Sequence, residues 1–577
     1  MFKRLLRLQS VNLGFEDNAP RAFDFRGGDE DGGAVTALPT EIVPTTANLN
    51  SSISLFKMYG VLFGVSALFA GLFFILAKWT FDYFKDPKGL RRYPNMHFLS
   101  GITNVPYMLL SEKGFRSKKL LELHASGMPV IRVGPNSLSY GDTRAIKDIY
   151  GHNTKCTKDE NYVVTAGTHY HLADVVDKKE HQRKRKVLSS AYALKNLEEW
   201  EFKVADKTIR LINQIDKRCS DYGHDEIVDY KPWLNYFTLD AIADIGISHR
   251  LGFLDQGSDR TKSLRWDGSS FESNYRECLY ANSQANSVIG YCYDYYRPLV
   301  KLSKWLPHYN RLWKLNEGWD GIVLNLTTER LKRYQAGEKL DDFFEAMMHD
   351  KNGVANNLEF GEIAAEVSIM MNAGSTTTAI AMTNVMYMLL KNPVCMQKLR
   401  DEVDDVLDED EVIAPYEKVK YLPYLRACLD ESMRIFPPTS HGLTRATPPE
   451  GSVICGEFVP GNTTVSVSAF VAHRDPKIFP DPEKYTPERW LGEAGKELGP
   501  YFVAFSAGAR GCIGRNISYL EQTVVLASML HRYDFELADP AFEPERHEFM
   551  NLHLSALPVR IRRRARETLS EKPVVMT

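Results

Sequence analysis

Cysteine is scarce in this 577-residue sequence and follows no paired pattern. Its eight cysteines form no CxxC pair and are irregularly spaced. This usage argues against a disulfide framework or a structural zinc site, and it favours a reducing compartment. An excess of positive charge is also absent, because 71 lysines and arginines stand against 74 acidic residues and leave a net charge of −3. No nucleic acid is therefore expected as a partner.

The sequence also lacks strand–helix–strand alternation, internal repeats and any fingerprint for a flavin or a pyridine nucleotide. Residues 129–142, PVIRVGPNSLSYGD, predict a small hairpin, and residues 463–469, TTVSVSA, predict a short strand. Most other segments are typical of helices. Apolar spacing predicts one long helix over residues 197–215 and another over 362–390, which ends before Asn392-Pro393 because proline cannot continue it. The expected fold class is mainly α with small β-sheets.

One long uncharged run stands near the N-terminus. Residues 58–77 read MYGVLFGVSALFAGLFFILA, and twenty helical residues span about 30 Å, the thickness of bilayer hydrocarbon. We expect a single-pass membrane anchor at residues 58–78, although a buried core helix has a similar composition. Basic residues are denser after the run than before it, which places the C-terminal part in the cytosol. An alternative treats the basic start, MFKRLLRLQSVNL, as a mitochondrial presequence.

These patterns divide the chain into five parts. Residues 1–57 have little apolar periodicity and are expected to form a disordered, lumenal tail. The anchor at 58–78 is followed by a tether at 79–96, a large domain at 97–563 and a flexible tail at 564–577.

Cys512 lies in a loop rich in glycine and arginine, AFSAGARGCIGRN. A thiolate that binds a metal needs a lowered pKa, which inward-pointing N–H groups and nearby positive charge can provide. Taken alone, the loop fits a metal ligand, a nucleophilic cysteine or a tight surface turn.

The full pattern Phe505-x-x-Gly508-x-Arg510-x-Cys512-x-Gly514 resembles the haem-binding loop of the cytochrome P450 family. The resemblance implies that Cys512 is the thiolate ligand of the haem iron and the only metal ligand from the protein. It also implies that Phe505 packs beside the cysteine and that Arg510 pairs with a haem propionate.

Other segments match the family in its expected order. Glu431 and Arg434 are three residues apart on a predicted helix, and Arg489 lies in the segment Pro487-Glu488-Arg489-Trp490. The resemblance implies that these three side chains form a buried structural network. An exposed helical pair of this spacing would be common and weak.

The segment Ala373-Gly374-Ser375-Thr376-Thr377-Thr378 resembles the family's distal oxygen-binding segment. The resemblance implies that Gly374 leaves room for dioxygen and that Thr377 assists proton delivery, with Ala373 beside them. The sequence departs from the pattern at Thr376, where the family has an acidic residue. A hydroxyl can relay a proton but does not supply the charge of a carboxylate.

His181, Arg185 and Arg445 match family positions that reach the haem propionates. The basic cluster around them, residues 178–186, is either a solvated face or a docking surface for an acidic reductase.

The resemblance covers residues 85–563 and is closest to fungal microsomal members. It implies a monooxygenase with haem b held by an axial cysteine thiolate, O2 as oxidant and NADPH-derived electrons from a separate flavoprotein reductase. Cytochrome b5 is a further possible electron donor, and the substrate is a lipophilic molecule of secondary metabolism, of terpenoid, polyketide or aromatic type. The implied location is the endoplasmic reticulum membrane.

Three alternatives remain at this point. The chain could be a haem-thiolate isomerase or dehydratase that needs no reductase, or a non-catalytic haem-binding membrane protein. A haem-free enzyme with Cys512 as nucleophile would need a partnered histidine, which the sequence does not identify near the loop.

Overall fold

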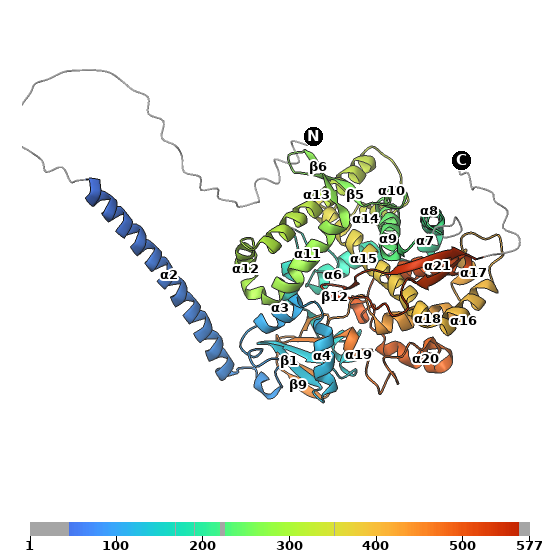
Figure 1. Cartoon of the computed structure of the whole chain (residues 1–577). Coiled ribbons are helices and arrows are strands. Elements are labelled where there is room, and N and C mark those ends of the chain that lie inside the picture. The colour runs from blue at the N-terminus through green and yellow to red at the C-terminus, as the bar shows by residue number, and fades with distance from the viewer. Residues whose placement is uncertain (1–45, 168, 190, 220–225, 351, 565–577) are drawn as a thin grey trace, which may run out of the picture. The chain divides into compact units, whose positions relative to one another are not determined.

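The computed structural model describes residues 46–167, 169–189, 191–219, 226–350 and 352–564. It comprises two compact units, residues 1–75 and 76–577 (Figure 1). Most of the expected N-terminal tail, residues 1–45, and most of the C-terminal tail, residues 565–577, lie outside the described residues.

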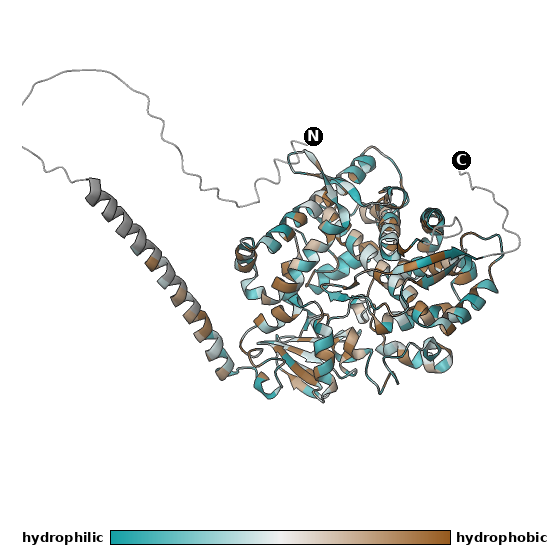
Figure 2. Cartoon of the chain, viewed as in Figure 1, coloured by the Kyte–Doolittle hydropathy of each residue, from teal (hydrophilic) through white to brown (hydrophobic). Residues whose placement is uncertain are grey.

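The anchor prediction falls on one continuous helix, α2 (Thr46–Lys85), which is longer than expected at both ends. It includes the last twelve residues assigned to the disordered tail and the first seven assigned to the tether. Within the described residues, one stretch is long and apolar enough to cross a membrane, Leu62–Lys85, with a mean hydropathy of 1.9 and no buried residues in its most apolar part. Figure 2 shows apolar residues along the described part of this helix.

The rest of the predicted tether is fastened to the second unit, residues 76–577. The Lys88 ammonium donates to the Asn136 side chain at 2.7 Å and to the Asn462 carbonyl at 2.6 Å. The Asp86 carboxylate accepts from the backbone N–H of Leu90 and Arg91, which begins the short helix η1 (Leu90–Arg92). The segment after the anchor is therefore a packed part of the domain.

The second unit is mainly helical (Figure 1). Its α-helices after α2 are α3 (Val105–Glu112), α4 (Arg116–Ala125), α5 (Ala145–Tyr150), α6 (Lys178–Ser189), α7 (Leu194–Glu199), α8 (Glu201–Asp216), α9 (Tyr230–Ile247), α10 (Phe253–Gln256), α11 (Tyr275–Ile289), α12 (Tyr296–Ser303), α13 (Pro307–Gln335), α14 (Phe343–Met348), α15 (Phe360–Lys391), α16 (Pro393–Asp404), α17 (Tyr416–Val419), α18 (Pro423–Ile435), α19 (Ala469–Ala472), α20 (Gly492–Leu498) and α21 (Arg515–Arg532). Further short helices are η2 (Glu160–Thr165), η4 (Gly290–Tyr295), η5 (Pro487–Trp490), η6 (Gly499–Tyr501) and η7 (Gly508–Arg510).

The strands form small sheets. The largest has the order β1-β2-β10-β7-β3, from β1 (Val130–Gly134), β2 (Ser137–Tyr140), β10 (Thr464–Val467), β7 (Arg445–Ala446) and β3 (Thr157–Lys158). The remaining strands pair as β11 (Tyr533–Leu537) with β14 (Pro558–Arg563) and β4 (Val228–Asp229), β12 (Arg546–Glu548) with β13 (Leu552–Leu554), β5 (Arg260–Leu264) with β6 (Ser270–Asn274), and β8 (Ser452–Ile454) with β9 (Glu457–Val459). The predicted hairpin is confirmed as β1–β2, and the predicted strand at 463–469 is confirmed as β10.

The helix predicted over residues 197–215 is instead two helices, α7 and α8. Trp200 separates them because its backbone leaves helical geometry, with φ −99° and ψ 9°. Its indole N–H donates to the Asp341 carboxylate at 2.7 Å. The break between the two helices thus coincides with a tertiary hydrogen bond of the buried Trp200 side chain.

The long helix α15 passes through the core and packs along α9. Two glycines allow the close approach of these helices. A Cβ on Gly246 would lie 2.7 Å from the Met370 side chain, and a Cβ on Gly374 would lie 2.7 Å from Ile242. The missing side chain of Gly374 thus serves helix packing, a role that the resemblance did not imply.

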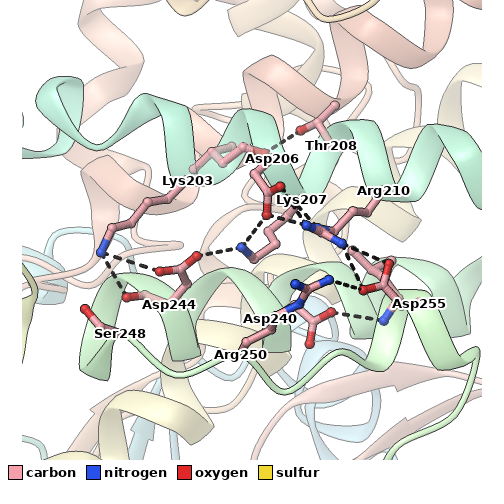
Figure 3. A network of polar contacts seen from close by, with 12 residues as sticks. Lys203, Asp206, Lys207, Thr208, Arg210, Asp240, Asp244, Ser248, Arg250 and Asp255 are labelled. Carbon is pink, nitrogen blue, oxygen red and sulfur yellow. Dashed lines mark hydrogen bonds and ion pairs between the residues drawn. The ribbon is translucent and has the colours of Figure 1, made fainter. Parts of the chain in front are cut away.

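An ion network fastens α9 to α8 on its other side (Figure 3). The buried Lys207 ammonium donates to Asp244 at 2.6 Å and to Asp206 at 2.7 Å. The Asp240 carboxylate accepts from the backbone N–H of Phe253 and Leu254 in α10. The network fixes α9 against α8, and α9 in turn packs along α15.

Candidate functional site

The loop that carries Cys512 is a closed turn between η6 and α21. The Cys512 N–H donates to the Phe505 carbonyl at 2.9 Å, and the Gly511 N–H donates to the Gly508 carbonyl at 3.0 Å. Gly508 has a φ of +65°, and a Cβ there would lie 2.1 Å from the Tyr150 carbonyl. Only glycine fits such a position without displacing α5. Gly514 precedes α21 directly.

Cys512 differs from the other seven cysteines, because it alone among them has an exposed side chain. Protein nevertheless surrounds the sulfur, since burial is the largest cause that raises the pKa of its thiol. The N–H of Gly514 and the charges of Arg185 and Arg515 offset the effect of burial only in part.

The N–H of Gly514 and the charge of Arg515 thus lower the thiol pKa as expected of the loop, but burial outweighs them. The guanidinium of Arg510 does not face the sulfur, because it donates to the carbonyls of Val175 and Val176 at 2.6 and 2.9 Å. The Arg185 guanidinium donates to the Gly511 carbonyl at 2.6 Å. A coordinated metal ion deprotonates a thiol without help from the loop.

Positive groups gather beside this loop. Burial, followed by the charge of Arg445, lowers the pKa of Arg510 to about 10. Burial, followed by the charges of Arg510 and Arg185, lowers the pKa of His181 to about 4. The Arg445 guanidinium donates to the Thr444 carbonyl at 2.9 Å and lies over the Tyr150 ring.

Lys158 is a further cation in this group, and the sequence analysis missed it. It is buried on β3, directly opposite Arg445 of β7 in the sheet register. Its ammonium donates to the Ala173 carbonyl and lies 4.0 Å from the centre of the Tyr162 ring. Burial and the charges of Arg445 and Arg510 lower the pKa of Lys158 well below its usual range. No local motif marks this lysine, because only the pairing of β3 with β7 brings it to the site.

These cations fit a group that carries carboxylates. Within the described residues, the hydrogen bonds of Lys158, Arg185, Arg445 and Arg510 go to backbone carbonyls, and no carboxylate forms an ion pair with them. Like charges held together in a buried place are costly unless an anion compensates them. Haem b carries two propionates and an iron that a thiolate can bind, so the residues present match it.

Ala373 and Thr377 form an open face in the middle of α15. Ala373 is exposed and Thr377 is half-buried, although most of the following residues of the helix are buried. The Thr377 hydroxyl donates to the Ala373 carbonyl at 2.8 Å. Thr376 is not part of this face, because it is buried and its hydroxyl has no hydrogen-bond partner among the described residues. One residue along a helix turns the side chain by about 100°, which explains the difference.

The predicted network behind the site is present. Both Glu431 and Arg434 have fully buried side chains, and their two bonds measure 2.8 and 2.9 Å. The Arg489 guanidinium donates to Glu431 at 3.0 Å. Trp490 and the backbone of Thr486 also donate to this carboxylate. Glu431 therefore accepts hydrogen bonds from four residues.

The basic cluster at residues 178–186 is largely neutralised by α15. Arg183 pairs with Glu362, and the buried Lys184 pairs with Glu362 at 2.6 Å and with Glu366 at 3.2 Å. Lys178, Lys179 and Lys186 remain exposed. The expectation of a wholly solvated basic face thus holds for only part of the cluster.

The fold and the site define a helical protein that holds an anionic prosthetic group beside a cysteine thiolate. Comparison with known proteins agrees. The family model for Cytochrome P450 matches residues 108–561, and the chain belongs to this family.

Curated relatives extend over most of the chain. Cytochrome P450 monooxygenase atr2 of Stereocaulon alpinum is 30% identical over 82% of this chain and 92% of its own length. Cytochrome P450 monooxygenase lnbC of Aspergillus flavus is 28% identical over 90% of this chain and 100% of its own length. Benzoate 4-monooxygenase bphA of Aspergillus niger is 27% identical over 81% of this chain and 92% of its own length. The protein is an oxidoreductase of this family, whose members use haem b with a cysteine thiolate and receive electrons from a redox partner.

Proposed function

We propose that this protein is a membrane-anchored monooxygenase that inserts one oxygen atom of O2 into a lipophilic organic substrate. The second oxygen atom leaves as water, with two electrons and two protons supplied from outside the chain. The observation that carries the proposal is the placement of the single exposed cysteine thiol beside four buried or half-buried cationic groups, Lys158, Arg185, Arg445 and Arg510, which have no carboxylate partner within the described residues.

In this proposal Cys512 is the iron ligand, and Phe505, Gly508 and Gly514 shape its loop. Bound haem supplies the iron that activates O2, because a thiolate ligand favours cleavage of the O–O bond. Arg445, Arg510, Arg185 and Lys158 neutralise the propionates, and the uncharged imidazole of His181 donates a hydrogen bond to them. Glu431, Arg434 and Arg489 act structurally behind the loop.

Thr377 is the proposed proton-transfer residue. Its hydroxyl lies on the open face of α15 and now donates to the Ala373 carbonyl, a bond that a side-chain rotation can exchange for one to an incoming oxygen. Thr376 stands where the family has an acid, but its buried position supports no direct role on the open face.

The test of the haem assignment is Cys512→Ser, with Cys395→Ser as the matched control at a half-buried cysteine. We expect Cys512→Ser to lose the thiolate form of the reduced carbon-monoxide spectrum while its far-ultraviolet circular dichroism is unchanged. The control keeps both. A Cys512→Ser protein with an unchanged spectrum would rule out this ligand.

For electron supply we propose a membrane-bound NADPH-dependent flavoprotein reductase, with cytochrome b5 as a possible second donor. The exposed lysines Lys178, Lys179 and Lys186 of α6 support docking of an acidic partner near the site. Charge reversal at these lysines should raise the KM for reductase and weaken its salt dependence. Product formation without reductase would favour the isomerase or dehydratase alternative, and haem binding without any turnover would favour the non-catalytic one.

We further propose a single-pass location in the endoplasmic reticulum membrane, with residues 97–563 as the cytosolic catalytic domain. The substrate class is a fungal secondary metabolite of terpenoid, polyketide or aromatic type, and the relative named for benzoate oxidation supports the aromatic option. Three segments, residues 162–171, 439–443 and 550–552, are proposed to line substrate access. Contact between the last two supports this, because the Thr439 hydroxyl donates to Asn551 at 3.2 Å. Screening compounds for shifts of the haem absorption band would test the class.

A further inference from the structure

Asp174 is a buried carboxyl group to which the proposed function gives no role. It lies in the segment between η2 and α6 and is 1% exposed. One carboxylate oxygen accepts from the His171 backbone N–H at 2.8 Å. The other oxygen, Oδ2, is buried and has no hydrogen-bond partner among the described residues, since the His171 ring nitrogen at 3.2 Å lies outside hydrogen-bond geometry. A buried carboxylate oxygen without a donor is costly, and a proton on that oxygen removes the charge that makes it so.

The backbone on either side of Asp174 binds two of the cations proposed for the propionates. The Ala173 carbonyl accepts from the Lys158 ammonium, and the Val175 carbonyl accepts from the Arg510 guanidinium at 2.6 Å. The charge of Lys158 acts on Asp174 as well. Asp174 therefore lies directly beside the proposed propionate site.

The same segment contacts α15 and α6 on its other side. Glu366 of α15 is buried, and its carboxylate accepts from the Leu172 N–H at 3.3 Å and from the Lys184 ammonium at 3.2 Å. A surface hollow lined in part by Glu362, Glu366 and Lys184 has room for about one water molecule. Solvent therefore reaches the Glu366 carboxylate, which is bonded to the backbone two residues before Asp174.

The balance of these groups leaves Asp174 close to changing its charge. The charges packed around it belong to Lys158 of β3, Lys184 of α6, Glu366 of α15 and Arg510 of η7. Burial raises the pKa of Asp174 to about 7, the charge of Lys158 opposes this shift, and the charge of Glu366 adds to it. Burial lowers the pKa of His171 to about 3, so its neutral imidazole supplies no counter-charge. Asp174 therefore gains or loses its proton near neutral pH.

An electron that enters the haem site adds a negative charge beside this group. A nearby negative charge disfavours the ionised form of a carboxyl group. A group that is half ionised near neutral pH responds to such a charge with the largest change in bound protons. Proton binding at Asp174 and electron entry should therefore depend on each other.

We propose that Asp174 takes up one proton from water when the first electron from the flavoprotein reductase enters the haem site. The electron adds one negative charge and the proton one positive charge, so the total charge of the buried site does not change. At Asp174 one O–H bond forms, and the carboxylate becomes a carboxylic acid. The inference rests on the proposed function, and it gives that site a regulation by pH, because reduction becomes easier as the pH falls.

The first test measures the midpoint potential of the full chain with haem as a function of pH. We expect the wild-type potential to fall as pH rises above about 7, because the reduced state binds more protons. The slope should approach one proton per electron, a tenfold change in the reduction constant per pH unit, or about 59 mV. Asp174→Asn should lose this slope. The matched control is Asp177→Asn, since Asp177 is exposed in the same segment and its amide can still accept from the Glu180 N–H.

The second test identifies the group that takes up the proton. The reduced-minus-oxidised infrared spectrum of the wild type should contain the carbonyl band of a new carboxylic acid. The band should shift when the aspartate carboxyl carbons carry carbon-13, and it should be absent from Asp174→Asn. The labelled wild type answers the question even where the variant does not fold.

A potential that does not depend on pH would overturn the inference, and so would a slope that Asp174→Asn retains. A slope without the carboxylic acid band would assign the proton to a cation such as Lys158. A band that shifts only with labelled glutamate would assign it to Glu366, and either result would overturn the role of Asp174. A chain that binds no haem would contradict the proposed function itself, whereas a haem-bound chain without the slope would contradict only this inference.

Discussion

Neutralising Glu431 tests whether the buried network behind the haem loop holds the fold. Glu431→Gln keeps the shape of the side chain but removes the charge that Arg434 and Arg489 share. The amide also presents donors where the guanidinium groups already donate.

The magnitude follows from burial. Arg434 is fully buried and would be left with three carbonyl acceptors, those of His473, Pro482 and Lys484. Removing one partner of a buried ion pair costs about 3–5 kcal/mol. Since whole domains are stable by only about 5–15 kcal/mol, the variant should lose between a fifth and all of its stability.

The assay is urea unfolding followed by circular dichroism and haem absorbance. Glu493→Gln is the control, because Glu493 pairs with Lys496 at 2.6 Å on the surface, where such pairs contribute little. If Glu431→Gln cannot be purified as a folded protein, Arg489→Lys serves as a milder variant. It keeps the positive charge but loses part of the hydrogen bonding of the guanidinium group, at a cost of about 1.5–3 kcal/mol. A Glu431→Gln protein as stable as the surface control would refute the reasoning.

Further expected outcomes concern the site. Lys158→Met should release haem to excess apomyoglobin faster than Lys178→Met, since Lys158 is buried beside the proposed propionate site and Lys178 is exposed; equal rates would contradict its role. Thr376→Val should keep or raise the free energy of unfolding, because it removes a buried hydroxyl that has no hydrogen-bond partner among the described residues. Thr377→Val should instead divert NADPH-derived electrons to peroxide, which can be measured once a substrate is known. Burial raises the pKa of Asp174 to about 7, so the folded state holds this proton more tightly than the unfolded state, whose pKa is about 3.9. The unfolding free energy of the wild type should therefore fall as pH rises from about 4 to 7, by about 1.4 kcal/mol per unit of pKa shift. The Asp174→Asn variant should not show this fall. Parallel pH profiles of the two proteins would exclude the effect.

Local chemistry made much of the site predictable. The turn around Cys512 needs glycine at Gly508, and the helix α15 must end before Pro393, so both follow from short segments. The helical spacing of Glu431 and Arg434 predicts a shared face. Burial turns this weak surface pattern into a network, and burial is a property of the complete fold.

The sequence by itself determined the family, the mainly helical class, the apolar run near the N-terminus and the motif residues proposed to hold the iron, because each depends on neighbours a few positions apart. Tertiary structure alone decided which charges remain unpaired and which surfaces remain open. Strand pairing brings Lys158 opposite Arg445, α15 neutralises Arg183 and Lys184, and Ile242 accounts for the packing role of Gly374. Long-range contacts decide these features, since the pairing of a charge and the exposure of a side chain depend on the residues packed around it and not on its neighbours in the sequence.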